Sequence, residues 1–173
     1  AAYVMQHNFG FDLPKAMHPE FGRIVQAETD AVGREITPQR IYDLFKANYI
    51  DAAAPYQLLR HSFAEFTDED GRSHVTFAGT IRHHDTVFQV QGSGNGPIDS
   101  FFNAIHGQKM DQFTFVDYKE HAVSVGSDSM AVAYIQLRDK GGQDHFGVGI
   151  SHNINLAPLK GILSAINRAV SGT

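Results

Sequence analysis

The 173-residue sequence lacks cysteine, which excludes disulfide bonds and thiolate metal sites. It has no apolar run near the roughly 20 residues that a membrane-spanning helix needs. Basic residues are also few: 14 Lys and Arg stand against 19 Asp and Glu, a net charge of −5. A negative chain of this kind does not favour nucleic acid. These absences predict a soluble cytoplasmic protein with no membrane and no nucleic-acid partner.

The first third of the sequence predicts a small helical subdomain. The opening residues, AAYVMQ, look like a strand already under way and include no initiator Met, so we expect a fragment of a longer protein. Pro14 suits the first turn of a helix that Gly33 ends, and Thr37-Pro38 is typical of an N-cap followed by proline. The stripe of the first helix is Met17, Phe21, Ile24 and Val25. We expect a helical linker subdomain over 1–55, with its boundary in DAAAPYQ.

From Tyr56 the apolar period changes from helical to alternating. Strands are predicted over 56–66, 73–81, 85–91, 113–123, 130–138 and 145–150, and helices over 97–107 and within 151–170. The order predicts an α+β fold in which two consecutive β-β-β-α units are related by pseudo-two-fold symmetry. We expect residues 56–173 to form this second domain.

The stretch VQGSGNGPIDSFFNAI joins a predicted strand to a predicted helix through a glycine-rich turn. A phosphate-binding loop needs Lys and Ser or Thr just after the glycines, whereas Pro97 and Asp99 follow here. The turn still exposes backbone N–H groups at a helix start, where the carboxylate of an amino acid is favoured. A tight turn that simply requires glycine is the alternative. Asn153 lies in a similar polar turn before the last helix.

The sequence gives weaker signals for a metal site or a catalytic site than for the glycine-rich turn. His83 and His84 are adjacent in a predicted turn, and no histidine pair has metal-ligand spacing, so we predict no metal site. Asp117 and His121 fall on one face of a strand and make an acid–base pair conceivable, but no nucleophile completes a catalytic set. Small residues such as Ala131 leave room for either a packed helix or a ligand.

Three motifs in this order resemble the C-terminal regulatory domain of 2-isopropylmalate synthases. They are GSGNGPIDSFFNAI, VDYKEHAVSVGSDSMAVAYI and FGVGISHNINLAPLKGILSAINR. The upstream AYVMQHNFGFDLPKAMHPEFGRIVQAETD and ITPQRIYDLF resemble the linker of the same enzymes, so the resemblance covers nearly the whole chain.

The resemblance implies a function that composition does not show. The full enzyme condenses acetyl-CoA with 2-oxoisovalerate on a TIM barrel that holds a divalent metal (Mg, Mn or Zn). That barrel is absent here, so this chain is expected to be inactive alone, with no catalytic residue and no cofactor of its own. The regulatory domain is implied to form a homodimer and to bind L-leucine as a feedback inhibitor.

Carried over by motif, the implied leucine site consists of Gly94, Asn95, Gly96, Asp99, Phe115, Tyr118, Ala122, Ser129, Ala131, Ile154 and Ala157. Tyr49 matches a linker tyrosine that couples the domains. Asp99 and Ser129 depart from the family, in which small residues such as Ala occur. Phe9 stands where some members carry His, so no linker histidine is carried over.

Three other functions compete with leucine sensing. A related citramalate-type synthase would use a similar regulatory domain to sense isoleucine. A stand-alone small enzyme would use Asp117 and His121. A purely structural dimerisation module would bind no amino acid.

Overall fold

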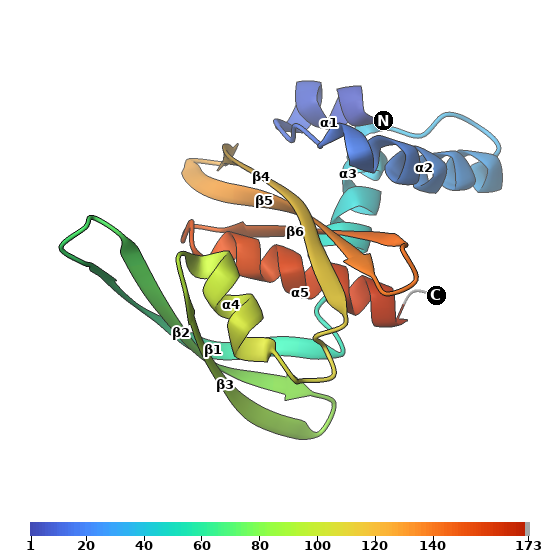
Figure 1. Ribbon diagram of the computed structural model, residues 1–173. Coiled ribbons are helices and arrows are strands. Elements are labelled where there is room, and N and C mark those ends of the chain that lie inside the picture. The colour runs from blue at the N-terminus through green and yellow to red at the C-terminus, as the bar shows by residue number, and fades with distance from the viewer. Residues whose placement is uncertain (172–173) are drawn as a thin grey trace.

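The chain folds as an N-terminal helical segment followed by two β-β-β-α units (Figure 1). The computed structural model describes residues 1–171, apart from the side chain of Val125, so the last two residues of the predicted domain 56–173 lie outside it. The helical segment contains α1 (Ala2–Phe9), a 3₁₀ turn (Lys15–Met17), α2 (His18–Val32), α3 (Pro38–Phe45) and a π-helical turn (Lys46–Ile50). The first unit contains β1 (Tyr56–Thr67), β2 (Ser73–His83), β3 (Thr86–Gly94) and α4 (Pro97–Ile105). The second contains β4 (Phe113–Val125), β5 (Asp128–Asp139), β6 (Asp144–Ser151) and α5 (Leu156–Ser171).

The predicted α+β class and its two units are confirmed. Each unit forms a three-stranded antiparallel meander, in the orders β1-β2-β3 and β4-β5-β6, and a helix follows each sheet. The alternation of apolar residues explains this agreement, because each sheet buries one face against the helices.

The predicted N-terminal strand is wrong. Residues 2–9 form α1, and Gly10 ends it in the left-handed conformation, with φ of 78°. The aromatic and β-branched side chains of Tyr3 and Val4 favoured a strand, but packing overrides this propensity because a helix buries Met5 completely in the linker core.

The other helix boundaries follow the capping residues. The Thr37 side chain accepts the Arg40 N–H at 3.1 Å, and Pro38 occupies the first position of α3, as predicted. Gly33 ends α2 with φ of 80°. Pro14 precedes a 3₁₀ turn rather than starting the helix directly, so α2 begins later than expected, at His18.

The two β-β-β-α units are layered, with α4 and α5 between the two sheets (Figure 1). One buried cluster joins the facing sides of both sheets to both helices. It includes Phe77 and Ile81 from β2, Phe101 from α4, Ile135 from β5 and Ile162 from α5. The two units therefore share one hydrophobic core.

The outer face of the second sheet carries the helical segment. A separate cluster combines Val132, Tyr134 and Val148 of this face with Phe21 and Phe45 of the helices. The sheet β4-β5-β6 is thus covered on both sides, by α5 within the domain and by the linker helices outside it.

Helix α5 approaches β6 so closely that only glycine fits at two strand positions. A Cβ atom on Gly147 would lie 2.2 Å from the Gly161 carbonyl oxygen and 2.3 Å from the Ala165 nitrogen. A Cβ atom on Gly149 would lie 2.0 Å from the Ala157 carbonyl oxygen. Glycine therefore sets the distance between this helix and its sheet.

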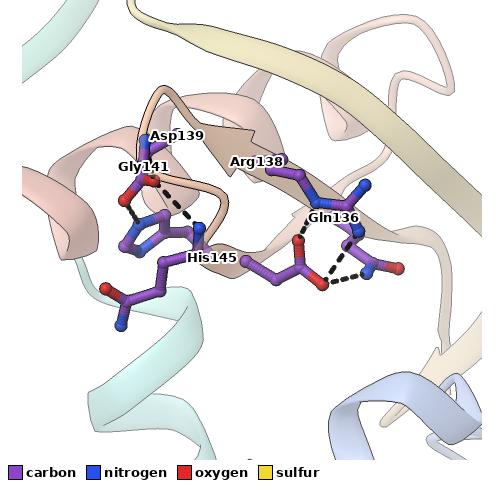
Figure 2. Close-up of polar contacts among 7 residues, drawn as sticks. Gln136, Arg138, Asp139, Gly141 and His145 are labelled. Carbon is purple, nitrogen blue, oxygen red and sulfur yellow. Dashed lines mark hydrogen bonds and ion pairs between the residues drawn. The ribbon is translucent and has the colours of Figure 1, made fainter.

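The β5–β6 hairpin is closed by side chains of its own turn (Figure 2). One oxygen of Asp139 accepts the N–H groups of Gly141 and Gln143 at 2.9 Å, and the other pairs with His145 at 2.8 Å. Asp68 makes the equivalent contacts with Asp70, Arg72 and His74 in the β1–β2 hairpin. The histidine hydrogen bond and the backbone donors lower the pKa of Asp139 and of Asp68.

Within residues 1–171, no helix combines the length and the apolar character required to cross a membrane.

The glycine contacts at α5 generate a stability prediction. Gly147→Ala should lower the free energy of unfolding by about 1–3 kcal/mol, because the methyl group collides with the backbone of α5. Gly22→Ala is the matched control, since a Cβ atom there has no neighbour within 4 Å. The control should raise stability by about 0.5–1 kcal/mol through helix propensity. Urea titration measures both, and unchanged stability of Gly147→Ala would contradict the close packing.

Candidate functional site

The glycine-rich turn lies between β3 and α4, and its own aspartate closes it. Oδ2 of Asp99 accepts the Asn95 N–H at 3.0 Å. A Cβ atom on Gly94 would lie 2.3 Å from the same Oδ2, so glycine makes room for this carboxylate. An acidic residue in the first turn also interacts favourably with the helix dipole. The Asn95 donor that we expected to be free is therefore already occupied.

The second asparagine turn, between β6 and α5, is also closed locally. The Ser151 hydroxyl accepts the Asn153 N–H at 3.0 Å, and the Asn153 side chain accepts the Asn155 N–H at 2.9 Å. The Asn153 carbonyl accepts the N–H groups of Leu156 and Ala157. Ile154 projects outward and is 66% exposed. Both turns thus place an asparagine just before a helix whose start packs into the shared core.

Strand β4 contributes three predicted ligand residues to one face of its sheet. Phe115 is opposite Leu137, Tyr118 is opposite Ile135, and Ala122 is opposite Ala131. Directly paired residues share a face, so these side chains lie on the side covered by α5. Because α5 packs on β5 and β6, Phe115 and Tyr118 remain 37% and 41% exposed.

The small residues near this face pack against each other. Ala131, Ala133 and Ala157 form a buried cluster between β5 and the first turn of α5. Close helix packing, one of the two roles expected for small residues such as Ala131, therefore accounts for its size. Ser129 lies two residues earlier on β5 and is exposed.

One aromatic contact links the two units beside these residues. The rings of Phe102 on α4 and Phe115 on β4 meet edge to face, with centroids 6.1 Å apart.

The predicted ligand residues divide into two groups according to the unit in which they lie. One is the first turn, with Gly94, Asn95, Gly96 and Asp99; the other is the second sheet and turn, with Phe115, Tyr118, Ala122, Ser129, Ala131, Ile154 and Ala157.

Tyr49 is fully buried where the linker meets α5. Its hydroxyl donates to Oε1 of Glu20 at 2.7 Å, and Arg168 pairs with the same oxygen at 3.1 Å. The Arg168 guanidinium lies 4.2 Å from the centroid of the Tyr49 ring, a cation–π contact. Burial, with the hydrogen bond to Glu20, raises the pKa of Tyr49, so the hydroxyl stays protonated.

Two more polar side chains of α5 hold the linker. The Ser164 hydroxyl donates to the Tyr49 carbonyl. The Asn167 side chain accepts the Tyr56 N–H at 2.8 Å and donates to the carbonyls of Ala52 and Tyr56, both at 2.9 Å. We call Ser164, Asn167, Arg168, Tyr49 and Glu20 the linker clasp.

Four members of the linker clasp were not predicted from the sequence, although the sequence contains a signal for three of them. Ser164, Asn167 and Arg168 are the polar positions of the closing motif S-A-x-N-R. Their spacings of three and one place them on one side of a helix that is otherwise apolar. Polar residues in a buried helix require partners. Here Ser164 and Asn167 bind backbone groups of Tyr49, Ala52 and Tyr56, whereas Arg168 pairs with the Glu20 carboxylate.

Asp117 and His121 do not form the conceivable acid–base pair. Asp117 accepts the Tyr118 N–H at 2.8 Å, whereas the His121 ring contacts the Tyr134 hydroxyl at 2.9 Å. Their neighbour Lys119 forms an ion pair with Asp12 at 2.7 Å, and this hydrogen bond lowers the pKa of Asp12. This face of β4 therefore attaches the N-terminal segment to the sheet.

The histidines of the predicted turn have a structural role. The ring of His83 stacks on Tyr56 with centroids 4.2 Å apart, and His84 occupies the left-handed region with φ of 55°. Across the part of the chain that the structure describes, no three His, Asp or Glu side chains gather to hold a metal ion.

Comparison with known proteins identifies relatives over most of the chain. Residues 35–170 match the family model of the LeuA allosteric (dimerisation) domain. The chain is 40% identical to a 2-isopropylmalate synthase of Clostridium acetobutylicum, over 97% of this chain and 30% of that protein. It is 38% identical to the 2-isopropylmalate synthase of Pseudomonas entomophila, over 98% of this chain and 29% of that protein. It is 34% identical to the 2-isopropylmalate synthase of Rhodospirillum rubrum, over 96% of this chain and 29% of that protein. The chain thus spans about 30% of the length of these curated relatives.

The linker clasp generates a second stability prediction. Asn167→Ala should destabilise the chain by roughly 1–3 kcal/mol for each buried backbone group left without a partner. Asn155→Ala is a control at a half-buried position in the second asparagine turn, where the backbone N–H of Asn155 rather than its side chain makes the hydrogen bond. It should change stability by less than about 1 kcal/mol. Thermal unfolding compares the two, and equal melting temperatures would show that Asn167 does not hold the linker.

Proposed function

We propose the function of this chain from the family to which it belongs: it is a member of the LeuA allosteric (dimerisation) domain family. We propose that it is the regulatory part of a 2-isopropylmalate synthase and that it binds L-leucine as a feedback inhibitor. The match over residues 35–170 carries this proposal, and the paired β-β-β-α units agree with it. The division into a linker over 1–55 and a regulatory domain over 56–173 belongs to the same proposal.

In this proposal, leucine binds between the asparagine turns and the exposed part of β4. Backbone donors at the helix starts favour its carboxylate, and apolar side chains suit its isobutyl group. Phe115, Tyr118 and Ile154 are substantially exposed in a single chain. A second copy of the chain would cover them, so we propose that the homodimer completes the site.

The catalytic part lies elsewhere in the longer protein. We propose that a cytoplasmic TIM-barrel domain performs the condensation with a divalent metal and that the 173-residue chain alone is inactive. The proposed role of the 173-residue chain is to lower the activity of the catalytic domain, through the linker, when leucine binds.

Asp99 supports a second candidate function. Its carboxylate occupies the Asn95 N–H and places a negative charge at the turn. Both features weaken the binding of any α-carboxylate, which leucine and isoleucine share, so a structural dimerisation module that binds neither amino acid is the alternative.

Titration calorimetry of the 173-residue chain with L-leucine, L-isoleucine and L-valine tests the function. We expect L-leucine to bind most tightly. Asp99→Ala should tighten that binding by roughly ten-fold, because it frees the Asn95 donor and removes a like charge, together worth about 1.4 kcal/mol. Asp30→Ala on α2 is the control and should leave the affinity unchanged.

Each outcome of this titration has a distinct meaning. Preference for L-isoleucine would support the citramalate-type alternative. If none of the three amino acids produces heat of binding, the chain is a structural dimerisation module. Unchanged affinity in Asp99→Ala would place the carboxylate away from the first turn.

The linker clasp predicts how leucine affects catalysis in the full-length enzyme. Tyr49→Phe removes the hydrogen bond to Glu20 and should raise the leucine concentration for half-inhibition by roughly five-fold or more, within the usual coupling range of about 1–3 kcal/mol. Leucine binding measured by calorimetry should stay within about two-fold, since Tyr49 lies outside the proposed site. Tyr42→Phe on α3 is the matched control. Inhibition that is unchanged in Tyr49→Phe would exclude this coupling route.

A further inference from the structure

Glu120 on β4 has a carboxylate oxygen that the chain leaves without a partner. Its Oε1 accepts the Tyr118 hydroxyl at 2.9 Å. Its Oε2 is buried and has no hydrogen-bond partner, the one such side-chain atom found among the residues that the structure describes. Burial of a carboxylate oxygen is unfavourable unless a donor or a cation compensates it.

No basic side chain within residues 1–171 forms an ion pair with Glu120. The adjacent Lys119 points to the opposite face of the sheet and pairs with Asp12. The described residues therefore supply no donor for Oε2 of Glu120, and a bound molecule can supply one.

The neighbours of Glu120 on β4 indicate what kind of molecule could bind to its carboxylate. It lies between Tyr118 and Ala122 on the same face of β4, and its cross-strand partner is Ala133 of the buried alanine cluster. A small ligand on this face would meet a carboxylate, a tyrosine ring and methyl groups. This combination suits a compact apolar cation better than a metal ion, because a metal requires several oxygen ligands.

We propose that Glu120 binds the α-ammonium group of the amino-acid effector. The inference rests on the proposed function and deepens it: the helix starts receive the carboxylate, Glu120 receives the ammonium group, and the exposed Phe115 and Ala122 on the same face receive the isobutyl group. Glu120 thus makes the site specific for amino acids and excludes branched carboxylic acids of the same shape.

A pair of ligands tests this assignment on the unaltered 173-residue chain. L-leucine and 4-methylpentanoate share the isobutyl group and the carboxylate, but the second lacks the ammonium group. Calorimetry should show binding of L-leucine that is roughly 10-fold to 100-fold tighter, the range of a charge-assisted hydrogen bond.

The variant Glu120→Gln should then weaken L-leucine binding by a similar factor and leave 4-methylpentanoate binding unchanged or tighter. Glu65→Gln, an exposed glutamate on β1, is the control and should bind both ligands as the parent does. Circular dichroism confirms that each variant is folded, and the ligand comparison on the parent does not depend on any variant.

The outcomes separate this inference from the proposed function. If the parent chain binds L-leucine and Glu120→Gln binds it equally well, the assignment of Glu120 is wrong and leucine sensing stands. If the parent binds neither ligand, both fail. If Glu120→Gln instead weakens dimerisation in sedimentation experiments with leucine affinity intact, the partner of Glu120 is a basic side chain of the second copy, and the inference is overturned.

Discussion

The close approach of α5 to β6 is the constraint on which the other layers depend. At Gly147 and Gly149 no strand side chain separates β6 from the helix, so α5 packs directly against the strand backbone there. From that position the helix reaches α4 and the first sheet on one side and the linker on another. Its apolar residues build the shared core, while its polar residues Ser164 and Asn167 bind backbone carbonyls between Tyr49 and Tyr56. A bulkier strand residue would displace all of these contacts together.

Helix α5 also connects the two ends of the proposed regulatory mechanism. It begins at the asparagine turn of the proposed effector site and ends at the linker clasp, and its 16 residues span about 24 Å. A helix held at both ends moves as a unit, so a ligand at its start can favour one position of the linker. Such a ligand shifts the equilibrium only by its difference in affinity for the two positions. In the structure, the contacts among Tyr49, Glu20 and Arg168 that hold the linker on α5 are formed.

Two carboxylates near the proposed site have opposite local situations. Asp99 accepts a backbone N–H of its own turn and is satisfied without a ligand. Glu120 keeps one buried oxygen without a partner. Hydrogen-bond satisfaction therefore separates a carboxylate that stabilises the fold from one that is available to a ligand, although both lie on segments that the family resemblance assigns to leucine binding.

The sequence by itself determined the elements and their order, because alternating and helical apolar periods, glycines and caps act locally. The two β-β-β-α units, the Thr37 cap and the Gly33 stop followed from these signals, and only α1 escaped them, since its conformation depends on burying Met5. The tertiary structure decided which polar atoms meet. It separated Asp117 from His121, placed Asp99 on the Asn95 donor, and joined S-A-x-N-R to a linker more than 100 residues away in the chain. The contacts of S-A-x-N-R depend on how α5 packs between the sheets and the linker, and no local pattern of residues encodes the position of the linker relative to α5.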